Sequence, residues 1–280
     1  VWSEYVPNVH LDSVKMTPNL EDFSLDLEFA VAVPETLWNG QLMVKTVVSF
    51  NGYVVNTSYT AVVSDRLKTK INVFSRLVPG CDWGMMKWTP EEPNLYDIEF
   101  TLLKGHTVID QIGSYVGMRD IKIQGPNILL SGRPIYQRLI LDQGYWKDSH
   151  LTPPSEEALI EDIDKIMALG YNGVRKHMKV EDERFLYWAD KLGYLVWGEY
   201  PNWGLRNADP MALYSILPEW LEELERDRNH PAIVGWCPLN EVWDAGGHKP
   251  YSDFIRMVYR VTKAVDPGRP YIDTSGGFHV

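Results

Sequence analysis

An amide and a carboxylate end an apolar segment in the last third of the chain. The segment from Ala232 to Leu239 is typical of a buried strand, yet Asn240 and Glu241 follow it directly. A protein core tolerates these two groups poorly, because burying them without partners is costly. Two interpretations are open: the pair caps a following turn, or it marks a strand end that opens on a functional pocket.

Other polar side chains occupy the same kind of position. Asp142, Arg175, His177 and Glu199 each lie at or near the end of a short predicted strand. In a barrel of parallel strands, the carboxyl ends of the strands share one face, and the active site lies on that face. We therefore expect these side chains to gather around one pocket if this part of the chain folds as a barrel.

The second half of the chain alternates strands with amphipathic helices, which predicts a parallel sheet with right-handed crossovers. A doubly wound sheet and a (β/α)8 TIM barrel share this pattern. No glycine-rich phosphate loop follows the first strand, and the polar residues collect at strand ends, so a partial TIM barrel with five of its eight strands fits better. The predicted strands are 135–142, 172–177, 195–200, 232–240 and 271–275, and the predicted helices are 155–169, 181–192, 212–228 and 251–265.

The first half of the chain has a different period. From Phe23 to Val33, apolar residues alternate with polar or small ones, as in a half-buried strand. Turn signals such as Asn51-Gly52 separate seven such segments, which predicts an antiparallel, immunoglobulin-like β-sandwich. We expect two domains, a sandwich over 1–117 and the barrel part over 118–280. The predicted strands are 9–17, 21–33, 41–50, 53–64, 67–77, 95–103 and 106–116.

Composition and charge exclude several classes of protein. A net charge of -11 and a pI near 5.1 disfavour nucleic-acid binding, because polyanions are repelled. No run of about 18 apolar residues is present, so membrane insertion is not expected. The first residues do not form a signal peptide, and a cytoplasmic parent protein is favoured. Cys81 and Cys237 are expected to be free thiols, and no metal or cofactor motif is found.

Several motifs together resemble those of glycoside hydrolase family 2, the group of β-galactosidases, β-glucuronidases and β-mannosidases. The most specific runs from Asn229 to Ile233 and continues through Trp236 to Asn240-Glu241. A second match is the segment 193–201, and weaker likeness covers residues 1–4 and 117–121. The resemblance implies a sandwich module before a barrel, closest to a β-galactosidase. It also implies that the family's N-terminal jelly roll and the end of the barrel are missing from this chain.

The resemblance implies roles for three residues. Glu241 is the general acid/base of a retaining mechanism, and Asn240 contacts the sugar 2-hydroxyl. Glu241 then needs a raised pKa, which apolar neighbours such as Trp236 and Trp243 are expected to provide. Arg175 supports the ionised nucleophile, although an internal salt bridge is an alternative for it.

Further residues are candidates for sugar contacts, each with a structural alternative. Many family members have Arg-x-Ser-His-Tyr-Pro where this chain reads Arg175-Lys176-His177-Met178-Lys179, so the sugar subsite differs here. A carboxylate near the pocket either contacts the sugar or makes a hydrogen bond within the protein. A single tryptophan more often belongs to the core than stacks on a sugar. The predicted substrate-binding residues are Asp142, His177, Glu199, Trp203, Trp236 and Trp243, with Trp146 a further candidate.

One catalytic role has no candidate in this chain. A retaining glycosidase needs two carboxyl groups about 5 Å apart, and the resemblance places the nucleophilic glutamate on the seventh barrel strand, beyond Val280. We therefore expect an exo-β-glycosidase fragment that is inactive alone, with a non-catalytic carbohydrate-binding or scaffold module as the alternative. The expected partner is a β-glycoside, and unpaired barrel edges predict self-association.

Overall fold

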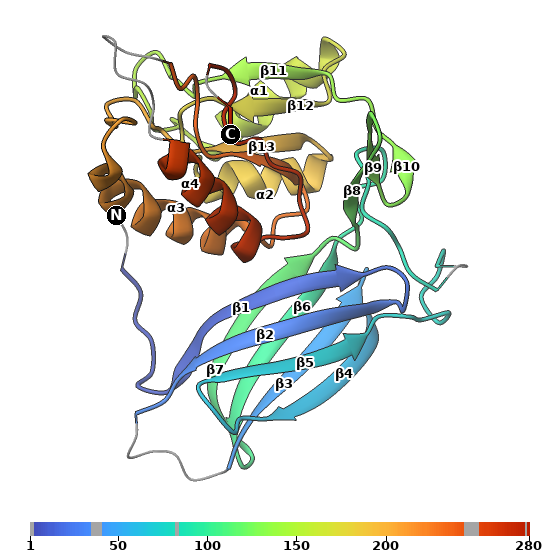
Figure 1. Cartoon of the computed structure of the whole chain (residues 1–280). Helices are drawn as coiled ribbons and strands as arrows, with labels where there is room; N and C mark the ends of the chain where they lie inside the picture. Colours follow the sequence, from blue (N-terminus) through green and yellow to red (C-terminus); the bar gives the residue numbers. More distant parts are fainter. Residues whose placement is uncertain (1–2, 35–40, 82–83, 244–251, 278) are drawn as a thin grey trace. The chain divides into compact units, whose positions relative to one another are not determined.

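A computed structural model describes residues 3–34, 41–81, 84–243, 252–277 and 279–280. The chain forms two compact units (Figure 1). One contains Val1–Trp88 and Asn94–Arg119, and the other contains Thr89–Pro93 and Asp120–Val280. Over the described ranges, no helix has the length and apolar character that a bilayer crossing requires.

The first unit is a β-sandwich of seven antiparallel strands, as the sequence predicts (Figure 1). One sheet has the order β1-β2-β5 and the other the order β4-β3-β6-β7. This arrangement confirms the immunoglobulin-like sandwich. The strands are β1 (His10–Asn19), β2 (Ser24–Ala32), β3 (Leu42–Phe50), β4 (Tyr53–Ala61), β5 (Arg66–Asn72), β6 (Tyr96–Lys104) and β7 (Thr107–Val116).

Alternating side chains hold the two sheets together. In β3, Val44 and Val48 are fully buried, whereas the residues between them on the other face are partly exposed. Phe29 of β2 meets Phe100 of β6 edge to face, with ring centroids 5.3 Å apart. Burying one such side chain stabilises the fold by roughly 1.5–3 kcal/mol. The core is therefore built between the sheets, and the outer faces are left to solvent.

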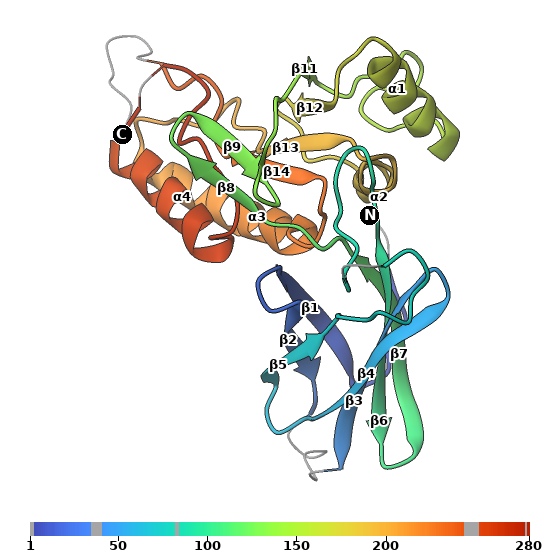
Figure 2. The same ribbon diagram turned by 90° about the vertical axis from the view of Figure 1, so that its right-hand side faces the viewer.

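The second unit contains a parallel sheet in the order β11-β12-β13-β14, with helices between successive strands. Each strand pairs with the next one along the chain, as in a barrel, whereas a doubly wound sheet reverses its order. Helix α1 lies beside α2, and α3 lies beside α4 (Figure 2). The strands are β11 (Leu139–Asp142), β12 (Gly173–Lys176), β13 (Leu195–Glu199) and β14 (Ile233–Cys237), and the helices are α1 (Glu156–Ala168), α2 (Glu183–Leu192), α3 (Leu213–Asp227) and α4 (Ser252–Val265).

Local sequence signals set the helix ends. Ser155 is the N-cap of α1 and accepts a hydrogen bond from the backbone N–H of Ala158. Asp182 does the same for α2, with the N–H of Arg184 as donor. Gly193 is the C-cap of α2 and adopts a left-handed conformation (φ 74°) that glycine tolerates at low cost. Of the predicted helix 251–265, residue 251 lies outside the described residues.

Two parts of this unit differ from the sequence prediction. A small antiparallel sheet, β8 (Ile121–Gln124), β9 (Asn127–Leu130) and β10 (Arg133–Pro134), was not predicted. Its strands are too short to show a clear period, and Gly125 (φ 57°) marks the turn. The predicted fifth parallel strand is reduced to an isolated bridge between Trp236 and Tyr271, with further backbone bonds such as Ser275 N–H to the Leu239 carbonyl at 3.0 Å.

Candidate active site

The chain stays buried from β14 through Asn240 and becomes exposed at Glu241. Asn240 is only 4% exposed, and the residues from Pro231 to Leu239 are all buried. Glu241 has φ 42°, in the left-handed region that a non-glycine residue adopts at a cost of about 1–3 kcal/mol. Such a strained conformation persists only where the surrounding structure holds it, and it is found most often at functional sites. The chain therefore makes a sharp exit where the amide and carboxylate lie.

Buried hydrogen bonds hold Asn240 on both its backbone and its side chain. Its N–H donates to Oδ1 of Asn202 at 2.9 Å, and its carbonyl accepts from Nδ2 of Asn202 at 3.0 Å. Its side-chain Oδ1 accepts from Nη2 of Arg175 at 2.8 Å and from Oγ of Ser275 at 2.6 Å. Because two donors occupy Oδ1, the amide orientation is fixed and Nδ2 remains as a donor for a ligand.

Arg175 links this amide to a buried carboxylate. Its Nε donates to Oε2 of Glu199 at 2.6 Å, and its Nη2 also donates to Oγ of Ser275 at 2.8 Å. The second oxygen of Glu199 lies 3.0 Å from Nδ1 of His177 and accepts the N–H of Met178 at 3.0 Å. The structure thus brings Arg175, His177, Glu199 and Asn240 together at the ends of three neighbouring strands.

The position of Glu199 corrects the prediction that it contacts sugar. Its side chain is 0% exposed, and both of its oxygens are taken up by Arg175, His177 and the backbone. A carboxylate in this position serves as a structural acceptor, since the Arg175 guanidinium and the Met178 N–H compensate its burial. The contact between Arg175 and Glu199 is the internal salt bridge that was the alternative role for Arg175. Its Nη2 atom binds Asn240 at the same time.

Asp142 belongs to a second charge cluster, on the opposite face of the sheet from the Arg175 network, because it pairs in register with Lys176 whereas Leu141 pairs with Arg175. It pairs with Lys176, whose ammonium also lies 2.6 Å from Oε2 of Glu181. Burial alone would raise the pKa of the Asp142 carboxyl, but the Lys176 ammonium outweighs it and holds the pKa below its usual value. Lys179 lies 3.1 Å from Oε1 of Glu181 and donates to the carbonyls of Gly144 and Leu151. This cluster ties the loop after β11 to the end of β12.

A hollow of about 620 Å³ lies at the ends of β11, β12 and β13. Its volume is in the range of small-molecule sites. His177 links its wall to the Arg175 and Glu199 network, and Trp203 is 73% exposed beside it. Its lining also includes Gln143, Tyr145, Met178 and Lys179. The mixture of rings, apolar groups and hydrogen-bonding groups is suited to a sugar.

The predicted tryptophans fall into two groups. Trp243 is 60% exposed and, like Trp203, presents its ring to solvent. A β-carbon placed on Gly276 would lie 3.9 Å from both Cγ of Glu241 and Cζ2 of Trp243, so these two side chains flank the same backbone. Trp146, in the loop after β11, is partly buried and bridges to His150.

Trp236 has a different environment, and its predicted role is wrong. It is 0% exposed, its Nε1 donates to Oδ2 of Asp266 at 2.8 Å, and its ring meets that of Trp220 at 5.6 Å. Alternating side chains on a strand point to opposite faces, and Trp236 points to the helix side of the sheet. It therefore belongs to the core, and neither stacks on a sugar nor surrounds Glu241.

Two residues of the network were missed by the sequence analysis. Ser275 is the last residue of the predicted fifth strand, so the rule that polar residues at strand ends line the site would have found it. Asn202 lies three residues after the end of β13, and its role depends on a contact 38 positions away that no local pattern encodes. Among the described residues, no group of three or more His, Cys, Asp or Glu side chains is arranged to hold a metal ion.

Comparisons with known proteins agree with both units. The profile described as "Glycosyl hydrolases family 2" matches residues 9–119, and that described as "Glycosyl hydrolases family 2, TIM barrel domain" matches residues 121–276. A β-galactosidase of Alteromonas mediterranea is 28% identical over 200 residues, which are 68% of this chain and 18% of that protein.

Solved structures share the fold. A β-galacturonidase of Eisenbergiella tayi bound to galacturonate has 25% identity and a TM-score of 0.75, covering 95% of this chain and 46% of that one. Bacteroides uniformis β-glucuronidase 2, covalently bound to cyclophellitol-6-carboxylate aziridine, has 22% identity and a TM-score of 0.80, covering 95% and 34%. This chain thus spans less than half of each of these relatives. The sandwich, the sequential parallel strands and the two profile matches together show that the chain belongs to family 2 of the glycosyl hydrolases, with part of the family's TIM barrel.

Proposed function

We propose that this chain carries the acid/base half of a retaining exo-β-glycosidase site, with Glu241 as the general acid/base. The observation that carries the proposal is the buried network of Arg175, Asn240 and Ser275, which ends at the exposed and strained Glu241. A rigid network next to one solvent-facing carboxyl group is the arrangement that proton transfer to a bound substrate requires.

Each residue has a defined task in this mechanism. Glu241 gives its proton to the glycosidic oxygen while the bond from that oxygen to the anomeric carbon breaks and a carboxylate nucleophile bonds to that carbon. Glu241 then takes a proton from the water that attacks the same carbon and releases the nucleophile. Asn240, with Oδ1 held by Arg175 and Ser275, has Nδ2 left to bind the sugar 2-hydroxyl.

The nucleophile is not assigned among the described residues. Glu199 is the nearest candidate by strand position, but its oxygens are taken up by Arg175, His177 and the N–H of Met178. A carboxylate held in this way is poorly placed to attack an anomeric carbon. We therefore propose that residues 1–280 alone do not hydrolyse glycosides, and that the second carboxylate comes from the missing part of the barrel.

For the substrate we propose a terminal β-galactoside, with a β-uronide as the alternative. The likeness to a β-galactosidase supports the first, and the likeness to uronidases supports the second. The described wall of the hollow favours a neutral sugar. Its one lysine, Lys179, already binds Glu181 and the carbonyls of Gly144 and Leu151, so it offers no unpaired ammonium to a uronate carboxylate.

Hydrolysis of two β-galactosides, one with a poor and one with a good leaving group, tests the proposal. The protein that contains this chain together with the rest of the barrel is compared with its Glu241→Gln variant. We expect the variant to lose about 10²–10⁴-fold in rate on methyl β-galactoside, whose leaving group needs a proton, and much less in the glycosylation step with 2,4-dinitrophenyl β-galactoside. Added azide, which attacks without base catalysis, should restore turnover of the activated substrate.

The control is Glu222→Gln, which changes an exposed carboxylate on α3 and should leave both rates unchanged. Equal losses on both substrates would contradict the assignment of Glu241 as the acid/base. Hydrolysis by residues 1–280 alone, abolished by Glu241→Gln, would refute the claim that the nucleophile is missing. Comparing galactosides with galacturonides and glucuronides decides the substrate class.

A second candidate function is a carbohydrate-binding module that does not hydrolyse its ligand. The exposed rings of Trp203 and Trp243 favour it, because stacking platforms bind sugar without chemistry. It predicts calorimetric binding of galactose that Trp203→Ala weakens and Glu241→Gln leaves unchanged, together with no turnover by the protein with a complete barrel.

A further inference from the structure

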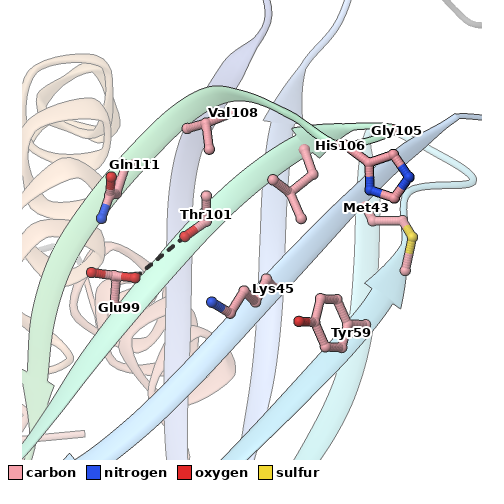
Figure 3. A pocket seen from close by; sticks show the side chains of 10 residues that line it. Met43, Lys45, Tyr59, Glu99, Thr101, Gly105, His106, Val108 and Gln111 are labelled. Carbon is pink, nitrogen blue, oxygen red and sulfur yellow. Dashed lines mark hydrogen bonds between the residues drawn. The ribbon is translucent and has the colours of Figure 1, made fainter.

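A second hollow, of about 560 Å³, lies on the sandwich unit, on the outer face of the sheet β4-β3-β6-β7 (Figure 3). It is part of the first unit alone, and none of its residues belongs to the candidate active site. The side chains that line it come from all four strands and from the turn between β6 and β7. The hollow therefore needs an explanation of its own.

Strand register gathers the central side chains into one row. Tyr59 pairs with Lys45, Lys45 pairs with Thr101, and Thr101 pairs with Gln111, so the four residues cross the sheet side by side. Directly paired residues have Cβ atoms about 4.5–5.5 Å apart and project from the same face. Figure 3 shows Tyr59 and Gln111 on opposite sides of Lys45 and Thr101.

Thr101 lies at the base of the hollow, Tyr59 contributes an aromatic ring, and Gly113 leaves open space. Thr101 is only 5% exposed although it lies on an outer face, because the longer side chains around it cover it. Tyr59 is 58% exposed, so one side of its ring is open to a ligand. Gly113 pairs with Glu99 on the same face, and no atom lies within 4 Å of the point where its side chain would begin. This missing side chain leaves open space beside Glu99.

The polar groups around the ring include both donors and acceptors. Lys45 and His106 can donate, Glu99 accepts, and the Gln111 amide does both. In the described part of the chain, no hydrogen bond involves the side chains of Lys45 and Gln111, so both are available. A β-bulge between Leu102 and Leu103 lies next to the row, and bulges often re-aim side chains at functional positions.

From this arrangement we infer an accessory carbohydrate-binding site on the sandwich, with a neutral pyranose oligosaccharide as its ligand. A pyranose presents C–H groups on its face and hydroxyls around its edge. The Tyr59 ring stacks on the face, and Lys45, Glu99 and Gln111 bind the edge hydroxyls. Because the hollow lies on the outer face of the sheet and not inside the sandwich, a longer sugar chain has room to extend beyond it.

Charge and backbone pairing argue against other occupants. The net charge of -11 repels polyanions, and within the hollow the cation Lys45 is offset by Glu99. A peptide added as a further strand would need a free sheet edge. The row instead crosses the face of the sheet, and its inner strands β3 and β6 are paired on both sides. A neutral sugar chain suits such a face better than a polyanion or an extended peptide.

Binding is tested with residues 1–280 and three tetrasaccharides: β-1,4-galactotetraose, cellotetraose and tetragalacturonate. Backbone amide shifts map where each sugar binds, which separates this hollow from the candidate active site. We expect a neutral tetrasaccharide to shift amides in β3, β4, β6 and β7 with a millimolar dissociation constant. Tyr59→Ala should weaken that binding at least about fivefold, whereas Tyr59→Phe, which keeps the ring, should change it little.

The matched control is Tyr53→Ala, which removes a tyrosine of similar exposure (52% against 58%) from the same strand outside the hollow. Gly113→Leu fills the gap beside Glu99 and should also reduce binding. The inference is overturned if no tetrasaccharide shifts these amides at about 10 mM, a concentration that would reveal millimolar affinity. Equal affinities for Tyr59→Ala and Tyr53→Ala would overturn it as well, as would preference for tetragalacturonate. Shifts confined to residues 120–280 would support the proposed function alone and contradict this site.

Discussion

Replacing Glu199 by glutamine tests whether the buried network is as tightly coupled as its geometry indicates. Glu199 is fully buried and accepts from Nε of Arg175 at 2.6 Å and from the N–H of Met178 at 3.0 Å, with Nδ1 of His177 also 3.0 Å away. Glutamine has almost the same shape, but it has no charge and only one acceptor oxygen. Its NH2 group would therefore face either Nε of Arg175 or the N–H of Met178, and that donor would lose its acceptor.

The size of the effect follows from these contacts. Removing one partner of a buried ion pair costs about 3–5 kcal/mol. The Arg175 side chain is 26% exposed and keeps Asn240 and Ser275 as acceptors, so water and these groups offset part of the loss. We therefore expect Glu199→Gln to lower the free energy of unfolding of the barrel unit by about 2–3 kcal/mol.

Urea unfolding followed by tryptophan fluorescence measures this loss. Most of the tryptophans, including the buried Trp220 and Trp236, belong to the barrel unit, so its transition dominates the signal. With a slope near 2–3 kcal/mol/M, the midpoint should fall by about 1 M. Glu222→Gln on the exposed face of α3 should change stability by less than about 0.5 kcal/mol. A shift for Glu199→Gln no larger than this control would show that the network contributes little to stability.

Two further predictions concern other parts of the barrel unit. Burial raises the pKa of the Glu223 carboxyl well above 4.5, and the Asp227 charge adds to this shift. The folded state therefore favours protonated Glu223, and stability is lost as pH rises from about 4.5 through the folded pKa. Glu223→Gln should remove this loss, so the urea midpoint of the variant should rise relative to that of the wild type between pH 5 and pH 9. A difference between the two midpoints that does not change with pH would contradict the prediction. Gly193→Ala should cost about 3 kcal/mol, because its β-carbon would overlap the Pro90 carbonyl at φ 74°. Gly170→Ala, with φ 91° and open space around it, should cost only about 1–2 kcal/mol, and equal urea midpoints for the two variants would refute the argument.

Local sequence patterns predicted most of the elements. All seven sandwich strands were found, since alternation and turn residues are local signals, and the N-cap of α1 at Ser155 acts within three residues. The short hairpin of β8 and β9 was missed because four-residue strands carry too little periodicity. The fifth parallel strand was overestimated, since Tyr271 joins β14 through one isolated bridge to Trp236 instead of a continuous ladder.

Trp236 and Glu199 show what a sequence cannot decide. Both lie near strand ends among functional candidates, yet Trp236 points to the helix side of the sheet and Glu199 is fully buried and bound by Arg175 and the N–H of Met178. The period of a strand shows that side chains alternate between two faces, but it does not show which face packs against the helices. That is decided when distant elements pack together. Ser275 joined the site only because the chain segment after α4 lies beside β14.

The sequence by itself determined the two-unit plan and the place where chemistry is expected, because periodicity, caps and the motif around Asn240 and Glu241 are written within a few neighbouring residues. Tertiary structure alone decided which polar groups meet. Arg175 contacts residues 24, 65 and 100 positions away, and such contacts depend on strand order and register. The cross-strand row from Tyr59 to Gln111 likewise exists only once four strands are paired in register.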